Sequence, residues 1–202
     1  ENGILFVQIG KASQYPGETI CIDNDNILAA REAVNHLYKL GHRKIGYVGT
    51  DLKRIFSADR KAGYMLALAE NNVPFQENYY LEMPQVPKNK TDRLLRFLSR
   101  EDRPTAVLVS DDILAMVLEK TAFELHLQIP EDLSIISFNN SLFSKLSSPQ
   151  LTSIDINSRQ LGIEAASQMI NHIENPGLLA TKIIVPHFMI ERQSCAPPKA
   201  PR

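Results

Sequence analysis

Apolar and polar residues follow one another along the chain in blocks that predict strands and helices in alternation. Short runs rich in β-branched residues predict strands at residues 4–9, 19–22, 44–48, 79–83, 106–109, 134–138 and 151–156, and an extended pair around 183–190. Apolar residues at helical spacing predict a helix from Asp25 or Asn26 to the residue before Gly41, and further helices over 59–71, 91–99, 112–125 and 159–173. Repeated strand–helix units favour an α/β fold with parallel sheets covered by helices.

The end of the first predicted helix carries two interpretable residues. Gly41 stands where a left-handed C-cap is needed, a conformation that glycine adopts without steric cost. We interpret His42, which follows it, as a cation at the negative end of the helix dipole rather than as a catalytic base.

Composition places the chain among globular proteins of a reducing compartment. The 202 residues, 44% of them apolar, are enough for one large or two small domains with a real core. Two cysteines are too few for a disulfide scaffold, so we expect a cytoplasmic protein, and no run approaches the roughly 18 apolar residues of a membrane span. Because the net charge is only −1, any contact with DNA belongs to another segment.

Motifs for catalysis and metal binding are missing from the sequence. The five histidines show no metal-ligand spacing, which predicts no metal site. Neither a glycine-rich phosphate loop nor a Gly-x-Ser-x-Gly elbow occurs, so we expect no cofactor and no enzyme activity. The enzyme alternative is a small α/β transferase or hydrolase that uses Asp111 and Asp112 as acid and base.

The strand at 134–138 and the polar loop after it are the most informative segment. In an open α/β sheet, ligands are met just beyond the carboxyl ends of the strands. Asn139 and Asn140 follow this strand directly, where their amides can grip a polar small molecule. The segment therefore indicates binding rather than catalysis.

A series of short motifs in a fixed order resembles the effector-binding region of the lac repressor and galactose repressor (LacI/GalR) family. The motifs are Asp-Asn-Asp-Asn at 23–26, Leu-Gly-His-Arg-Lys-Ile-Gly-Tyr-Val-Gly at 40–49, Arg-Lys-Ala-Gly-Tyr at 60–64, Val-Ser-Asp-Asp at 109–112, Ile-Pro-Glu-Asp at 129–132 and Ser-Pro-Gln-Leu-Thr at 148–152. The asparagine pair after Ser137 and Phe138, together with the run at 23–26, is most similar to maltose operon repressors.

The resemblance implies a periplasmic-binding-protein-like type I fold of two subdomains with a sugar in the cleft. Residues 1–43 and 152–176 are then a remnant of an incomplete N-terminal subdomain and the crossover, and residues 44–151 and 177–193 form the C-terminal effector-binding subdomain. The proline-rich residues 194–202 are expected to be a loose tail. Operator DNA would be bound through a headpiece that is absent from this chain.

The same resemblance nominates four ligand-binding residues. Arg60 matches the family arginine that hydrogen-bonds the effector, and its guanidinium offers a planar fork of donors; the alternative is an exposed first-turn helix arginine. Asp111 and Asn139 stand where many relatives carry Asn and Asp; the alternatives are a helix N-cap and a turn residue, with Asn140 structural. Phe56, in a loop, either stacks on the sugar or packs in the core.

The helix predicted at 112–125 has more apolar positions than one buried face needs. Relatives dimerise through this helix and the loop near Ser147, so the resemblance implies a homodimer with Met116, Val117, Lys120 and Ser147 at the interface. The alternative is that all these side chains belong to the intramolecular core.

Together these features predict the sugar-sensing domain of a cytoplasmic, DNA-binding transcriptional repressor that responds to maltose or maltodextrin. The alternative with the same fold is a periplasmic-type sugar-binding protein of a transporter.

Overall fold

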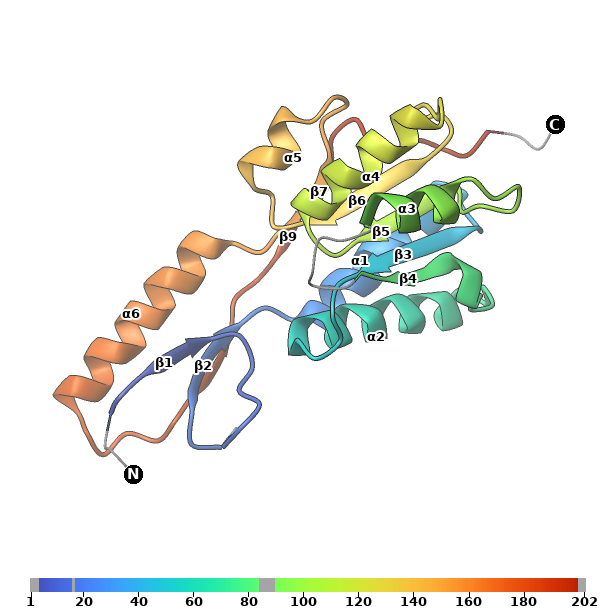
Figure 1. Cartoon of the computed structure of the whole chain (residues 1–202). Helices are drawn as coiled ribbons and strands as arrows, with labels where there is room; N and C mark the ends of the chain where they lie inside the picture. The colour runs from blue at the N-terminus through green and yellow to red at the C-terminus, as the bar shows by residue number, and fades with distance from the viewer. Residues whose placement is uncertain (1–3, 16, 84–89, 200–202) are drawn as a thin grey trace. The chain divides into compact units, whose positions relative to one another are not determined.

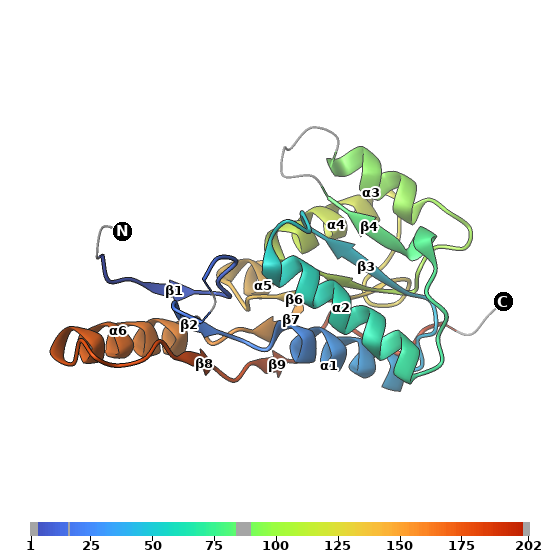
Figure 2. The same cartoon turned by 90° about the horizontal axis from the view of Figure 1, so that it is seen from below.

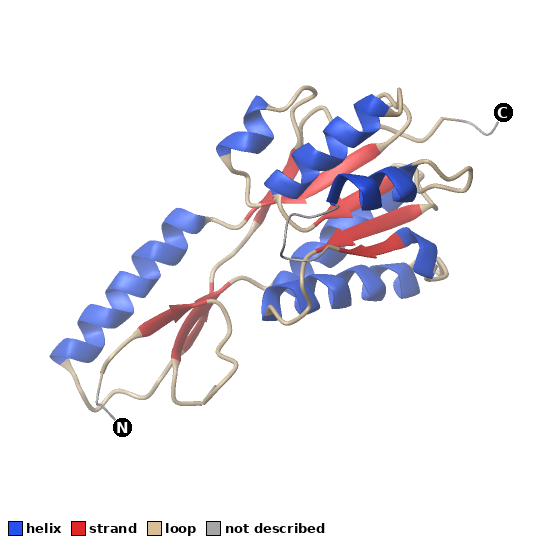
Figure 3. Cartoon of the chain, in the orientation of Figure 1, coloured by secondary structure: helices blue, strands red, loops and turns tan. Residues whose placement is uncertain are grey.

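The computed structural model describes residues 4–15, 17–83 and 90–199, and the chain divides into two compact units (Figure 1). The first unit comprises Glu1–Asp25 and Ile156–Phe188, and the second comprises Asn26–Asp155 and Met189–Arg202. Figure 3 shows the helices and strands of the chain. Apart from a short helix at Leu142–Leu146 and a 3-10 turn at Glu77–Tyr79, their order along the chain is the one that the apolar pattern predicts.

The first unit is a three-stranded parallel sheet with one helix against it. Its strands lie in the order β1 (Val7–Ile9), β2 (Ile20–Asp23) and β8 (Lys182–Ile184), and the helix is α6 (Ser158–Glu174). Ile22, Leu161 and Val185 form its small buried core. The Asn24 side chain ties the strand ends together, because its Nδ2 donates to the backbone oxygens of Ile156 and Val185.

The second unit is built on a six-stranded sheet. The strand order is β4 (Tyr80–Glu82), β3 (Ile45–Gly49), β5 (Ala106–Val109), β6 (Ser134–Phe138), β7 (Thr152–Asp155) and β9 (Phe188–Ile190). The pairs from β4 through β7 are parallel. The helices of this unit are α1 (Asn26–Lys39), α2 (Ile55–Glu70), α3 (Lys90–Leu98), α4 (Asp112–Glu124) and the short α5 (Leu142–Leu146).

Alternate residues of each strand supply two separate cores on the two faces of this sheet. On one face Tyr47 and Leu108 pack under α1 and α2, and on the other Val48 and Val107 pack under α3 and α4. Figure 2 shows these helix pairs on opposite sides of the sheet. The strands are therefore apolar throughout, as sequences of doubly covered parallel strands are.

Local predictions differ from the structure mainly at element ends. Residues 4–6 are not in the first strand, α2 begins at Ile55 rather than at 59, and α5 lies in the segment expected to be a loop. Gly41 lies two residues after the end of α1 at Lys39 and adopts a φ of +104°, which confirms the predicted left-handed cap.

The predicted subdomain boundaries differ from the observed units in three places, the first of which is β7, predicted with the N-terminal subdomain but paired with β6 in the second unit. Helix α1 belongs to the second unit because its alanine face packs against α2, and β8 belongs to the first because it pairs with β2. Residues 1–3 and 200–202, at the outer ends of two predicted segments, lie outside the described residues.

The prediction of a loose tail from residue 194 is wrong for its first residues. Ser194 is fully buried, and its Oγ donates to the Ile135 backbone oxygen at 2.5 Å, while Ile135 N donates back to Ser194 O. Lys199 pairs with Asp132 at 2.7 Å. Prolines exclude helix and ladder bonds, but side-chain and single backbone bonds still hold this segment against β6.

Candidate functional site

The carboxyl ends of β3 and β5 mark the point where the chain order of the second sheet reverses. From β3 the chain continues to β4 on one side and then returns to β5 on the other. The segments that follow neighbouring strands diverge at such a switch point and leave a crevice there, which is the usual binding place in open α/β sheets. This edge of the second unit is the candidate site.

Arg60 on α2 lies at this switch point and connects three elements. It is buried, with 5% of its surface exposed. Its Nε donates to Asn26 Oδ1 at 2.9 Å, and its Nη1 donates to the Ser110 backbone oxygen at 2.6 Å. The guanidinium lies 3.9 Å from the centre of the Phe138 ring. Arg60 is thus a positioned cation at the ends of β5 and β6, not the exposed helix residue of the alternative interpretation.

Phe56 lies on the same helix, one turn before Arg60. It is half-buried in the first turn of α2, so its predicted place in a loop is wrong. The Arg60 guanidinium is 5.0 Å from its ring centre. The cation therefore has an aromatic ring on each of two neighbouring elements, Phe56 on α2 and Phe138 on β6.

Asp111 directly follows Ser110, the residue that Arg60 contacts. It is the N-cap of α4, since its Oδ1 accepts from the Leu114 backbone N–H at 2.8 Å. The side chain is half-buried. The cap interpretation is thereby confirmed, while a ligand contact by the same carboxylate stays a prediction.

Asn139 and Asn140 follow Phe138 with positive φ values of +99° and +46°, which asparagine tolerates better than most residues. Asn140 is structural, as expected: its Nδ2 donates to Asp155 Oδ2 at 2.8 Å, and its Oδ1 accepts from Arg192. Asn139 is half-buried, and its backbone N–H donates to Ile154 O at 2.8 Å. Its predicted contact with a ligand remains a prediction.

Sequence reasoning missed the role of Asp112, which organises the same edge. Asp112 is buried, and its Oδ1 accepts from the hydroxyls of Ser137 and Ser153 at 2.5 and 2.8 Å, while its Oδ2 accepts from Ser141 N at 2.7 Å. These donors hold the ends of β6 and β7 and occupy both oxygens. The sequence shows serines at the ends of these strands, but it does not reveal which carboxylate accepts their hydrogen bonds.

The outer surface of α4 and α5 is apolar. We call it the α4/α5 patch; its exposed residues are Ile113, Met116, Phe123, Leu142, Phe143 and Leu146. Of the four predicted interface residues, Lys120 is 76% exposed in this surface, Met116 is exposed and Val117 is half-buried. Ser147 is buried, and its Oγ donates to Phe143 O at 3.0 Å. An apolar surface of this kind favours contact with a partner.

The described part of the chain contains neither a cluster of metal-ligating side chains nor a membrane-spanning helix. No group of three His, Cys, Asp or Glu side chains there could hold a metal ion. Within residues 4–15, 17–83 and 90–199, no helix is both long and apolar enough to cross a membrane.

Residues 34–195 match the model of the periplasmic binding protein-like domain family. The putative transcriptional regulator LacI from Bacillus cereus subsp. cytotoxis has a solved structure that is 33% identical to this chain and superposes with a TM-score of 0.88, over 95% of this chain and 68% of that one. The chain belongs to the LacI family. Its fold is the predicted periplasmic-binding-protein-like type I fold with parallel sheets flanked by helices, and its relatives are transcriptional regulators rather than enzymes.

Two further LacI-family relatives are similar over most of the chain. The HTH-type transcriptional repressor PurR of Klebsiella pneumoniae is 33% identical over 164 residues, which are 81% of this chain and 48% of that protein. A LacI family transcriptional regulator from Enterococcus faecium, solved with bound ribose, is 26% identical with a TM-score of 0.85 over 96% of this chain and 71% of that one. The chain spans about half the length of the curated relatives it matches.

Proposed function

We propose that this chain is the sugar-binding domain of a cytoplasmic transcriptional repressor and that its effector is maltose or a maltodextrin. The observation that carries the proposal is the position of Arg60 at the switch point, in contact with Ser110 and Phe138, the residues directly before Asp111 and Asn139. A guanidinium, a carboxylate and an amide are thereby gathered at one sheet edge.

The chemistry of these groups suits a ligand rich in hydroxyls. A carboxylate accepts from two neighbouring hydroxyls, a guanidinium donates in a planar fork, and an amide does both. The half-buried Phe56 ring beside Arg60 suits the apolar face of a pyranose. The LacI-family structure with bound ribose supports a sugar as the class of effector. The maltose assignment rests on the similarity of the asparagine pair and of residues 23–26 to maltose operon repressors.

Regulation would follow from a shift of conformational populations without any covalent step. A sugar that binds one conformation more tightly changes the affinity of the linked DNA site by a coupling free energy of about 1–3 kcal/mol. Operator DNA would be held by a segment outside this chain, and the α4/α5 patch would join two copies in a homodimer.

Asp111→Asn is the most informative substitution for testing the effector site. Asparagine is as good an N-cap as aspartate, so the free energy of unfolding should change little. The carboxylate is lost, and we expect at least a tenfold weaker affinity for maltose, about 1.4 kcal/mol, in isothermal titration calorimetry. Arg60→Ala is less suitable, because Arg60 also makes two buried structural hydrogen bonds.

The matched control is Asp92→Asn, which removes an exposed carboxylate from the first turn of α3. Its maltose affinity should equal that of the wild type. Glucose, maltose, maltotriose and ribose are titrated in parallel to identify the sugar class. Unchanged affinity in Asp111→Asn would remove this carboxylate from the effector site, and no binding of any of the four sugars would reject the proposal.

A further inference from the structure

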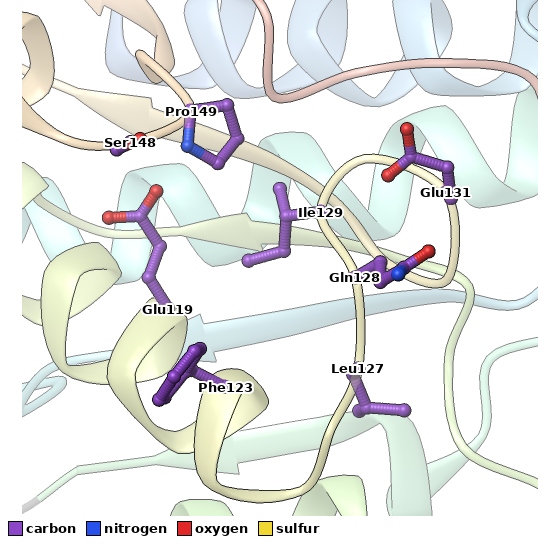
Figure 4. A pocket seen from close by; sticks show the side chains of 8 residues that line it. All are labelled: Glu119, Phe123, Leu127, Gln128, Ile129, Glu131, Ser148 and Pro149. Carbon is purple, nitrogen blue, oxygen red and sulfur yellow. The ribbon is translucent and has the colours of Figure 1, made fainter.

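A hollow of about 380 Å³ lies beside the α4/α5 patch, away from the sheet edge that carries Arg60. It is lined by the second half of α4, the segment after it and the turn at Ser148 and Pro149, and its lining residues include Glu119, Phe123, Ile129 and Glu131 (Figure 4). Polar and apolar atoms contribute equally to its walls. The effector proposal gives it no role.

Glu119 is the unusual group in this hollow. Its Oε1 is buried and has no hydrogen-bond partner among the described residues. Burial raises the pKa of Glu119 to about 7, which the Ser147 hydroxyl partly offsets. A buried carboxylate oxygen without a donor is costly, and a cation placed beside it would relieve that cost. The other ionisable lining residue, Glu131, has the same charge sign, so the hollow favours a cationic occupant.

A lysine side chain has the right chemistry for this space. Its hydrocarbon stem matches the walls formed by Phe123, Ile129 and Pro149, and its ammonium group matches the carboxylate. Lys120 is available on the same surface: it is 76% exposed, and its ion pair with Glu124 is long, at 3.9 Å. Such an exposed pair contributes little, so Lys120 can leave it at low cost.

Twofold symmetry makes this surface complementary to itself. In an isologous dimer, residue i of one copy contacts residue j of the other, and j contacts i in return. Glu119 lies next to Met116 and Phe123 on the helical surface of α4, and Lys120 lies between these two patch residues. Two α4 helices that meet through the patch therefore bring an acid and a base toward each other twice.

We propose that Glu119 accepts the ammonium group of Lys120 of the partner subunit in this hollow, with the reciprocal contact on the other copy. The proposal rests on the homodimer proposed above and specifies what locks and selects it. The charged pair would fix the register of the two α4 helices, which an apolar patch alone leaves loosely specified.

Charge reversal in each partner, followed by mixing, tests the pairing. Glu119→Lys and Lys120→Glu each place like charges together at both contacts, so each should raise the dimer dissociation constant at least about 100-fold in sedimentation equilibrium. In a heterodimer of the two variants, each of the two contacts again joins an acidic side chain to a basic one. The mixture should then form a heterodimer with a dissociation constant within about tenfold of the wild-type value.

Lys39→Glu on α1 and Glu101→Lys before β5 are the controls, because both are exposed and change the net charge equally. Their dissociation constants should match the wild type. If either variant keeps the wild-type dissociation constant, or if the mixture stays monomeric, the proposed pairing is wrong while the homodimer is still supported. A wild type that is monomeric at all concentrations would overturn both. Sugar titration of the same samples reports the effector site independently, and far-UV circular dichroism reports folding.

Discussion

At the scale of single residues, the Tyr47 hydroxyl is a buried polar group with no hydrogen-bond partner in the described part of the chain. Its ring stacks on Tyr80 with 5.8 Å between centroids, and it fills the space that a Cβ on Gly49 would occupy, 2.4 Å away. Burial raises the pKa of Tyr47 above its ordinary range, so the hydroxyl keeps its proton. The group thus loses its bonds to water on folding and gains none.

Tyr47→Phe should therefore stabilise the protein. Removing an unsatisfied buried hydroxyl should raise the free energy of unfolding by about 1 kcal/mol, measured by urea denaturation. Tyr64→Phe is the matched control, because the Tyr64 hydroxyl donates to Ile45 O at 2.9 Å and its loss should lower stability by about 1 kcal/mol. Equal changes in the two variants would show that the Tyr47 hydroxyl is satisfied in solution.

Sequence reasoning identified residues with local roles more completely than residues with distant partners. The Asp111 cap follows from a carboxylate three residues before the N–H it accepts, which is visible in the sequence. The burial of Arg60 depends on Asn26 and Ser110, which are 34 and 50 residues away. Periodicity carries no information about such pairs, and the resemblance supplied only the binding role of Arg60, not its structural one.

At the scale of elements, Gly63 on α2 allows a close contact between α1 and α2. A Cβ there would lie 2.2 Å from the Ile27 backbone oxygen and 2.9 Å from the Ala30 side chain, both on α1. The alanine-rich face of α1 lets the two helices approach to this distance. Since backbone atoms cannot give way as a flexible side chain does, the position accepts glycine only.

Gly63→Ala should lower the free energy of unfolding by about 2–3 kcal/mol, because it forces α1 and α2 apart. Gly162→Ala is the control within α6, where a Cβ meets nothing within 4 Å. It should raise stability by about 0.5–1 kcal/mol through helix propensity alone. Thermal melts of both variants measure the difference. Two variants of equal stability would mean that α1 and α2 readjust without cost.

The sequence predicted whether a segment is a strand or a helix wherever its apolar pattern was long. It did not predict to which of the two units each element belongs. The strands of the second unit follow from apolar runs that are buried on both faces, and its long helices follow from apolar residues at helical spacing on one face. Five-residue α5 is too short to show helical periodicity. The pattern of α1 shows that it is a helix but not which sheet it covers, which is why the predicted boundary at residue 44 differs from the observed one at Asn26.

At the scale of the whole molecule, two buried ionisable groups give the stability opposite dependences on pH. Burial lowers the pKa of His42, whose ring bonds Thr105, Ser134 and Ala196, so it is not the cation expected at a helix end. The unfolded chain takes up this proton more readily, and stability falls as pH drops below about 6.5.

Glu119 gives the stability the opposite dependence on pH. Its folded pKa of about 7 lies above the unfolded value of 4.5, so the folded state binds more protons between the two.

The Glu119 contribution should appear as stability that is lost as pH rises from about 4.5 to about 7. We expect a loss on the order of 1 kcal/mol, since solvent around the side chain screens its charge. Urea denaturation between pH 5 and 8, at concentrations too low for self-association, measures this loss.

Glu119→Gln has no carboxyl to titrate, so its stability should stay flat in this range apart from the decline at acid pH that His42 produces. Wild-type and Glu119→Gln curves that run parallel would mean that Glu119 ionises in the folded protein as it does in the unfolded chain. Its carboxylate would then already be satisfied without a partner.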